Sequence, residues 1–113
     1  MKIIGIGNEI FGDNEGKIVE EYGGIFLGPK LGELEKFLKE EDEVIIVDSA
    51  RNFRFLIIGL KELYPGVLGY TELENYLLNA KINGIKARIT IIAFSKEYKD
   101  RVKCFLNCML LKK

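Results

Sequence analysis

Histidine, tryptophan and glutamine are all absent from this chain of 113 residues. The absence of histidine removes the commonest metal ligand and general base of protein sites, so a site built on imidazole is excluded. Lysine, glutamate and isoleucine are abundant, and proteins of thermophiles favour lysine and glutamate while avoiding heat-labile amides. The composition therefore leans towards a thermophilic source.

A net charge is lacking as well, because 17 basic and 17 acidic residues cancel. A surface field of one sign attracts nucleic acid or an anionic membrane, and this composition does not provide such a field. We therefore expect neither a nucleic-acid partner nor a membrane partner.

Long apolar runs are missing too. The longest runs, such as Val44–Val47 and Phe55–Ile58, are far too short to span a bilayer. Met1-Lys2 leads directly into a short apolar run, without the longer stretch and the small-residue cleavage site of a secretory signal. Two cysteines are too few for a secreted disulfide framework. We expect a cytoplasmic protein.

The residues that are present suit one globular domain. Hydrophobic residues make up 48% of the chain and charged residues 30%, which fits a soluble protein with a packed core. A second core would leave too few residues for either one. We assign residues 1–113 to a single domain.

Strands and helices alternate through the first half of the chain. Short apolar runs predict strands at Lys2–Gly7, Ile25–Leu27 and Val44–Val47. A turn over Asn8–Asp13 leads into the first helix, with Asp13 as its N-cap and Asn14 and Glu15 beside its positive end. Gly23-Gly24 ends that helix. The second helix follows Pro29, and its apolar stripe is Leu31, Leu34, Phe37 and Leu38.

The second half adds a hairpin-like return, a helix, a strand and a closing helix. Phe53–Leu60 is the fourth predicted strand, and only about five residues separate it from the third, which is too few for a parallel crossover. We expect it to run antiparallel. Thr71 and Glu74 form a capping box for the third helix. Its core face is Leu73, Tyr76, Leu77 and Ala80. The fifth strand is Ala87–Phe94, and the closing helix has a stripe of Tyr98, Val102, Phe105 and Met109.

The element order βαβαββαβα predicts the α/β class. We expect a single-domain three-layer sandwich, with a mostly parallel five-stranded sheet that contains one antiparallel strand. Ligands of such sheets bind beyond the carboxyl ends of the strands, where the strand order reverses. If the first and third strands are neighbours, that crevice lies between Gly7-Asn8 and Asp48. Asp13, Asn14 and Glu15 would then lie close to it.

Asp48 is the strongest candidate for a functional residue, because it ends an apolar strand that opens onto this crevice. It is either a metal-binding or catalytic carboxylate or a structural cap of a neighbouring loop, and position alone does not decide between the two. Asp13 suits a helix cap better than a catalyst. Glu15 is either a metal ligand or a favourable first-turn charge.

Two other features favour structural roles. The turn Gly5-Ile6-Gly7-Asn8 lacks the third glycine and the acidic residue of a dinucleotide-binding fingerprint. Cys104 and Cys108 lie on one face of the closing helix, and no further ligand is near them in sequence. We expect both to be buried structural cysteines, since free cysteine often behaves as a small hydrophobe.

Four segments, in chain order, resemble the hydrogenase maturation endopeptidases. Lys2–Asp13 (KIIGIGNEIFGD), followed by a helix with Ile18-Val19-Glu20, is similar to the strand, G-x-G-N turn and acidic helix entry of that family. Glu43–Ala50 (EVIIVDSA) resembles its central strand, which ends in a metal-binding aspartate. Leu68–Leu73 resembles the opening of its third helix, and Ala87–Phe94 its last strand.

The resemblance implies a phosphorylase/hydrolase-like fold and a protease that clips a C-terminal peptide from the large-subunit precursor of nickel–iron hydrogenase. The partner would be that precursor. No cofactor would be bound permanently, and nickel would be met transiently, in the substrate. Family members contact this nickel through an acidic residue near the first helix, the central-strand aspartate and a histidine.

Carried over by position, the aspartate is Asp48, and the acidic residue falls at Asn14, with Glu15 next to it. The histidine, which follows a proline in the family, falls at Gly66 after Pro65. Gly66 would then line the substrate crevice together with Gly7 and Asn8. An amide and a glycine are poor replacements for nickel ligands.

Three functions are consistent with these residues. The first is a divergent maturation endopeptidase with Asp48 as its main carboxylate, assisted by Glu15 or Asp13. The second is a non-catalytic relative that acts as a binding or assembly module, since the expected histidine is absent. The third is an unrelated binder of a small ligand in the same crevice.

Overall fold

The computed structural model describes residues 1–7, 15–49 and 55–111. Its strands are β1 (Lys2–Ile6), β2 (Ile25–Gly28), β3 (Glu43–Ser49), β4 (Phe55–Gly59) and β5 (Arg88–Phe94). Its α-helices are α1 (Leu34–Glu40), α2 (Glu72–Asn83) and α3 (Lys99–Leu111). Four 3₁₀ helices join them in the described part of the chain: η2 (Glu15–Tyr22), η3 (Leu31–Glu33), η4 (Leu60–Glu62) and η5 (Lys96–Tyr98).

The five strands form one sheet in the order β2-β1-β3-β5-β4. The first four of these run parallel to one another, and β4 pairs antiparallel with β5. The predicted α/β class and the predicted antiparallel strand are both confirmed. The physical reason for the reversal is the short connection between β3 and β4, which leaves no room for a crossover helix.

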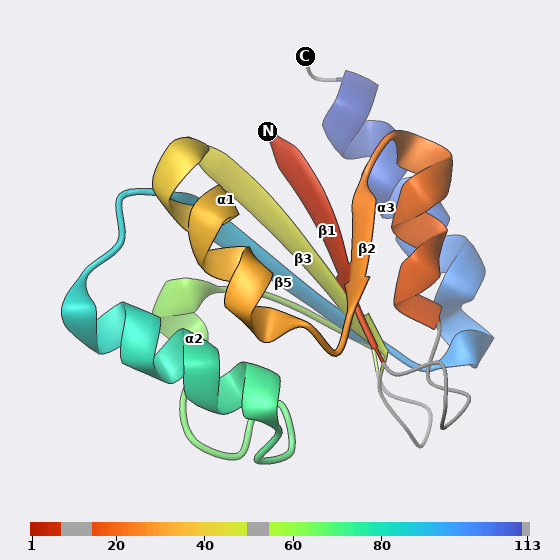
Figure 1. The fold of residues 1–113 in the computed structure, drawn as a ribbon. Coiled ribbons are helices and arrows are strands. Elements are labelled where there is room, and N and C mark those ends of the chain that lie inside the picture. The colour runs from red at the N-terminus through yellow and green to blue at the C-terminus, as the bar shows by residue number, and fades with distance from the viewer. Residues whose placement is uncertain (8–14, 50–54, 112–113) are drawn as a thin grey trace.

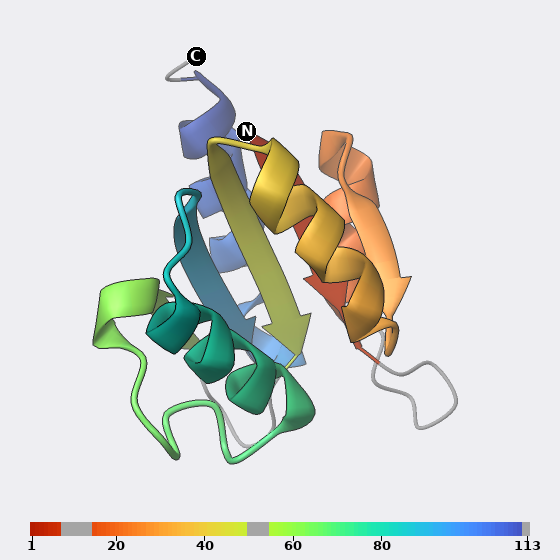
Figure 2. The same cartoon turned by 60° about the vertical axis from the view of Figure 1, so that its left-hand side comes forward.

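Helices cover both faces of the sheet, which gives three layers. Helices α1 and α2 lie on one face, while η2 and α3 lie on the other (Figures 1 and 2). Side chains of β3 alternate between the two: Val44 and Ile46 join the core under α1 and α2, whereas Ile45 and Val47 join the core under η2 and α3. A strand that is apolar on both faces is expected at the centre of such a sheet.

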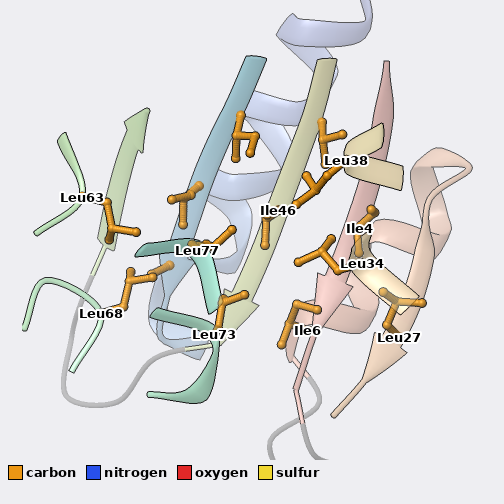
Figure 3. Packing of buried hydrophobic residues seen from close by; sticks show 14 of the residues in the cluster. Ile4, Ile6, Leu27, Leu34, Leu38, Ile46, Leu63, Leu68, Leu73 and Leu77 are labelled. Atoms are coloured by element: carbon orange, nitrogen blue, oxygen red, sulfur yellow. The ribbon is translucent and has the colours of Figure 1, made fainter. Parts of the chain in front are cut away.

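The face under α1 and α2, called the aliphatic face from here on, is filled by large side chains. Ile4 and Ile46 on the strands meet Leu34 of α1 and Leu77 of α2 (Figure 3), and all four are fully buried. Interiors of this kind are close-packed, and branched apolar side chains fill the space between helix and sheet.

The face under η2 and α3 is called the glycine face. At Gly16, no side chain lies between η2 and the sheet. Gly16 of η2 lies directly on the strands, so that a methyl group there would be 2.5 Å from the carbonyl oxygen of Ile6 and 3.0 Å from that of Val47. A methyl group on Gly5 of β1 would overlap the carbonyl oxygen of Gly16 in turn. Backbone lies on backbone here, and only glycine allows this approach.

Several predicted boundaries need correction. The first helix is a 3₁₀ helix that is described from Glu15 onwards, and it is followed by Gly23 in the left-handed region (φ 77°), as predicted. The third strand, predicted over Val44–Val47 with Asp48 at its end, spans Glu43–Ser49. The fifth strand begins at Arg88, one residue later than predicted. The first strand ends at Ile6, one residue before its predicted end at Gly7.

The predicted capping box of α2 is half correct. Thr71 is the N-cap, and its hydroxyl accepts a hydrogen bond from the backbone N–H of Glu74 at 3.2 Å. The carboxylate of Glu74 does not return to Thr71; it accepts a 2.7 Å hydrogen bond from the backbone N–H of Leu68. This buried contact fastens the loop before α2 to the helix.

Candidate functional site

The strand order reverses between β1 and β3. Strand β2 lies on the outer side of β1, whereas β5 and β4 follow β3. In the sheet register Ile6 pairs with Asp48, and Asp48 pairs with Ala93. Asp48 therefore lies at the carboxyl end of a central strand at the switch point, where open α/β sheets bind their ligands. The topology on which the predicted crevice depends is confirmed.

Asp48 is buried, with 9% of its surface exposed. Because side chains alternate along a strand, it lies on the same side of the sheet as Ile46, and its register neighbours Ile6 and Ala93 belong to the core of the aliphatic face. A carboxylate with apolar neighbours at the end of a strand is costly to bury without a compensating interaction. Asp48 therefore differs from an ordinary acidic residue, whose carboxylate is exposed to solvent.

Glu15 is the first residue of η2 and is partly buried. The next residue, Gly16, contacts the backbone at the ends of β1 and β3, which brings the start of η2 to the carboxyl edge of the sheet. Helix η2 packs on the glycine face, with Ile18 and Val19 in its core. The structure thus brings Glu15 and Asp48 to one edge of the sheet, but on its two different faces.

Asn8, Asp13 and Asn14 lie outside the described residues, so their places in the site stay predictions. Gly7 is described, and it is buried just beyond the end of β1. Its N–H donates to the carbonyl oxygen of Gly28 at 3.1 Å, which ties the exits of β1 and β2 together.

Gly66 lies in the loop before α2, where a turn is confirmed. Its φ of 96° is in the left-handed region, which favours glycine. Tyr70 folds back over it, and a methyl group on Gly66 would be 3.0 Å from the Tyr70 hydroxyl oxygen. Tyr70 itself has a φ of 58°, which is rare for an aromatic residue. The backbone at Gly66 therefore resists a side chain of any kind.

Two serines at the carboxyl edge were not singled out from the sequence. Ser49 follows Asp48, and its hydroxyl oxygen is buried without a hydrogen-bond partner among the described residues. Ser95 follows β5 and is 4% exposed. The pKa of Glu97 is lowered by a hydrogen bond from its own backbone N–H and by one with the Ser95 side chain. Ser49 ends an apolar strand and Ser95 follows one, and this position is the only signal that the sequence offers for either residue.

The cysteine prediction is wrong, because Cys104 and Cys108 are both exposed. Val102 and Leu106 are the residues of α3 that are buried against the sheet. Positions two residues further along a helix point to the opposite side. The predicted apolar stripe of the closing helix did not include Leu106. Without it, the solvent-facing side of α3 could not be identified correctly.

Metal ligands do not gather in the part of the chain that the structure describes. Residues 1–7, 15–49 and 55–111 contain no group of three or more histidine, cysteine, aspartate or glutamate side chains arranged to hold an ion. Within the same residues, no helix has the length and apolar character needed to cross a membrane.

Comparison with known proteins gives one structural relative. No family model matches the chain, and no curated protein matches it by sequence. The crystal structure of a [NiFe] hydrogenase maturation protease, HycI from Thermococcus kodakarensis KOD1, aligns with 96% of this chain and 89% of its own, at a TM-score of 0.52 and 19% identity. The chain shares the fold of that protease, so the predicted resemblance is confirmed at the level of the fold.

Proposed function

We propose that this protein is a divergent maturation endopeptidase that recognises the C-terminal region of a nickel–iron hydrogenase large-subunit precursor and cleaves it. The observation that carries the proposal is the shared fold over nearly the whole chain, together with the place of Asp48 at its switch point. A fold can host several activities, so the site has to support the assignment.

Asp48 is the residue to which we assign the central role. Hydrolysis of a peptide bond adds water to the carbonyl carbon, breaks the C–N bond and transfers a proton to the leaving amine. A carboxylate close to the scissile bond accepts the proton of the attacking water and returns it to that amine. Asp48 is the buried carboxylate that the sheet presents at its carboxyl edge.

Nickel enters this proposal as part of the substrate. Carboxylates supply oxygen donors, whereas nickel sites usually include imidazole, and the chain contains no histidine. Asp48 and Glu15 therefore fit a contact to an ion that the precursor already holds better than a resident nickel site. Either Glu15 or Asp13 would assist Asp48 as a second carboxylate.

The test is to incubate the protein with a nickel-loaded large-subunit precursor and follow the precursor by mass spectrometry. The wild type is expected to yield a product that has lost its C-terminal peptide. Asp48→Ala is expected to lower the cleavage rate by at least about 100-fold, the range of a lost general base. Asp42→Ala is the matched control, since Asp42 is exposed and precedes the other end of β3.

The two outcomes separate the remaining hypotheses. Equal cleavage by wild type and Asp48→Ala would overturn the assignment of Asp48. Tight binding of the precursor without trimming would instead identify the chain as a binding or assembly module. The sequence features that favour that alternative are the missing histidine and Asn14 at the expected acidic position.

A further inference from the structure

A pocket opens between α1 and α2, away from the carboxyl edge of the sheet. Its volume is about 580 Å³, which lies within the range of small-molecule sites. Leu38 and Lys39 near the end of α1 line it, as do Ile85 and Lys86 just before β5. These residues lie near the amino ends of β3 and β5, so the length of β3, roughly 20 Å, separates the pocket from Asp48.

The pocket has apolar walls. Leu38 of α1 is almost fully buried, and Ala80 and Ile85 also line the pocket. Tyr76 adds an aromatic ring that packs against the core of the aliphatic face. An apolar surface of this kind favours a ligand with an apolar body, because burying it removes hydrocarbon surface from water.

The polar lining carries an excess of positive charge. Lys39 and Lys86 contribute two positive charges and Glu35 one negative charge, so the lining has a net charge of +1. Lys39 is engaged by Glu35 at 3.0 Å. Within the described residues, the Lys86 ammonium group has no such ion pair. It is therefore the group that remains for an anionic ligand.

Two carboxamides complete the polar side. Asn79 and Asn83 are one turn apart on α2, so they project along the same side of the helix. Their side-chain amides make no hydrogen bond to other residues of the described chain. Tyr76 has a protonated hydroxyl group at neutral pH, as tyrosines ordinarily do, and burial and then the charge of Glu35 raise its pKa further.

We infer that this pocket binds a small amphipathic anion, with its apolar body against Leu38, Ala80 and Ile85 and its charged head at Lys86. The inference rests on the lining of the pocket alone. It does not depend on the proposed protease activity, and either can fail without the other.

The test uses the fluorescent probe 1-anilinonaphthalene-8-sulfonate, which combines apolar rings with one anionic group. A titration of the native protein is expected to show one saturable site, and decanoate is expected to displace the probe. N-phenyl-1-naphthylamine carries the same rings without the sulfonate. It is expected to bind about two- to fivefold more weakly, the range for the loss of one exposed charge contact.

Variants locate the site. Lys86→Glu is expected to weaken sulfonate binding about fivefold or more, and Ala80→Phe, which fills the pocket, is expected to abolish it. Lys36→Glu is the control, because Lys36 of α1 is exposed, as Lys86 is, but does not line the pocket. Because Ala80→Phe could disturb the packing of α2, its thermal unfolding is measured alongside. Equal binding by wild type and Lys86→Glu, or equal binding of the two probes, would overturn the inference.

Discussion

The two faces of the sheet are packed by opposite means. On the aliphatic face, α1 and α2 stand off the strands by the thickness of their side chains, with Leu34 and Leu77 against Ile4 and Ile46. On the glycine face, η2 lies on the strands with no side chain between Gly16 and the backbone of Ile6. The first arrangement is held by many dispersion contacts, and the second by a close fit of backbone to backbone.

The difference shows how the candidate site is positioned. Direct contact through Gly16 brings the start of η2, and with it Glu15, to the ends of β1 and β3. A larger residue at position 16 would push η2 outward. The glycine face therefore sets the position of the site, whereas the aliphatic face contributes most of the buried hydrocarbon.

The largest expected effect comes from adding one methyl group to the glycine face. Gly5→Ala is expected to lower the free energy of unfolding by about 3 kcal/mol, because the new methyl group meets the carbonyl oxygen of Gly16, which cannot turn away as a side chain could. Chemical denaturation measures the change. Gly32→Ala is the control, since nothing lies within 4 Å of the added methyl group there, and it should be close to neutral.

Removing one methylene group from the aliphatic face should cost less. Ile46→Val is expected to lower the free energy of unfolding by about 1 kcal/mol, because the buried side chain loses contacts while its neighbours relax in part. The same denaturation experiment applies. A cost equal to that of Gly5→Ala would contradict the proposed contrast between the faces.

The smallest effect is expected on the outer side of α3. Cys104→Ser should change the free energy of unfolding by less than about 0.5 kcal/mol, because the side chain is exposed. In the native wild type, a thiol reagent should label Cys104 and Cys108 without denaturant. Protection of either thiol would show that α3 is rotated or covered on this side.

Much of the fold follows from local pattern. The apolar runs locate the strands to within one or two residues where the structure describes them, and the short connection after β3 predicts the reversal of β4. Helix faces are less predictable. In the closing helical segment, the predicted stripe through Tyr98 of η5 and Phe105 and Met109 of α3 includes residues that are only partly buried. The fully buried Leu106 of α3 lies beside it.

The candidate site was predicted in part. Asp48 and the switch point follow from the element order, since a carboxylate at the end of an apolar strand opens onto the edge of the sheet. The burial of Ser95 and of the Ser49 hydroxyl oxygen was not predicted, because a serine at the end of a strand resembles an ordinary loop residue. The pocket between α1 and α2 has no signature in sequence, because its lining combines two helices and a loop.

From its residues alone, the chain specifies the strands, their order of appearance and the carboxylate at position 48, because periodicity and connection length act locally. The fold alone decides which glycines must stay small, which side of α3 meets solvent, and that Glu15 and Asp48 approach one edge from two faces. Those properties depend on distances between segments far apart in sequence, and no local pattern encodes such distances.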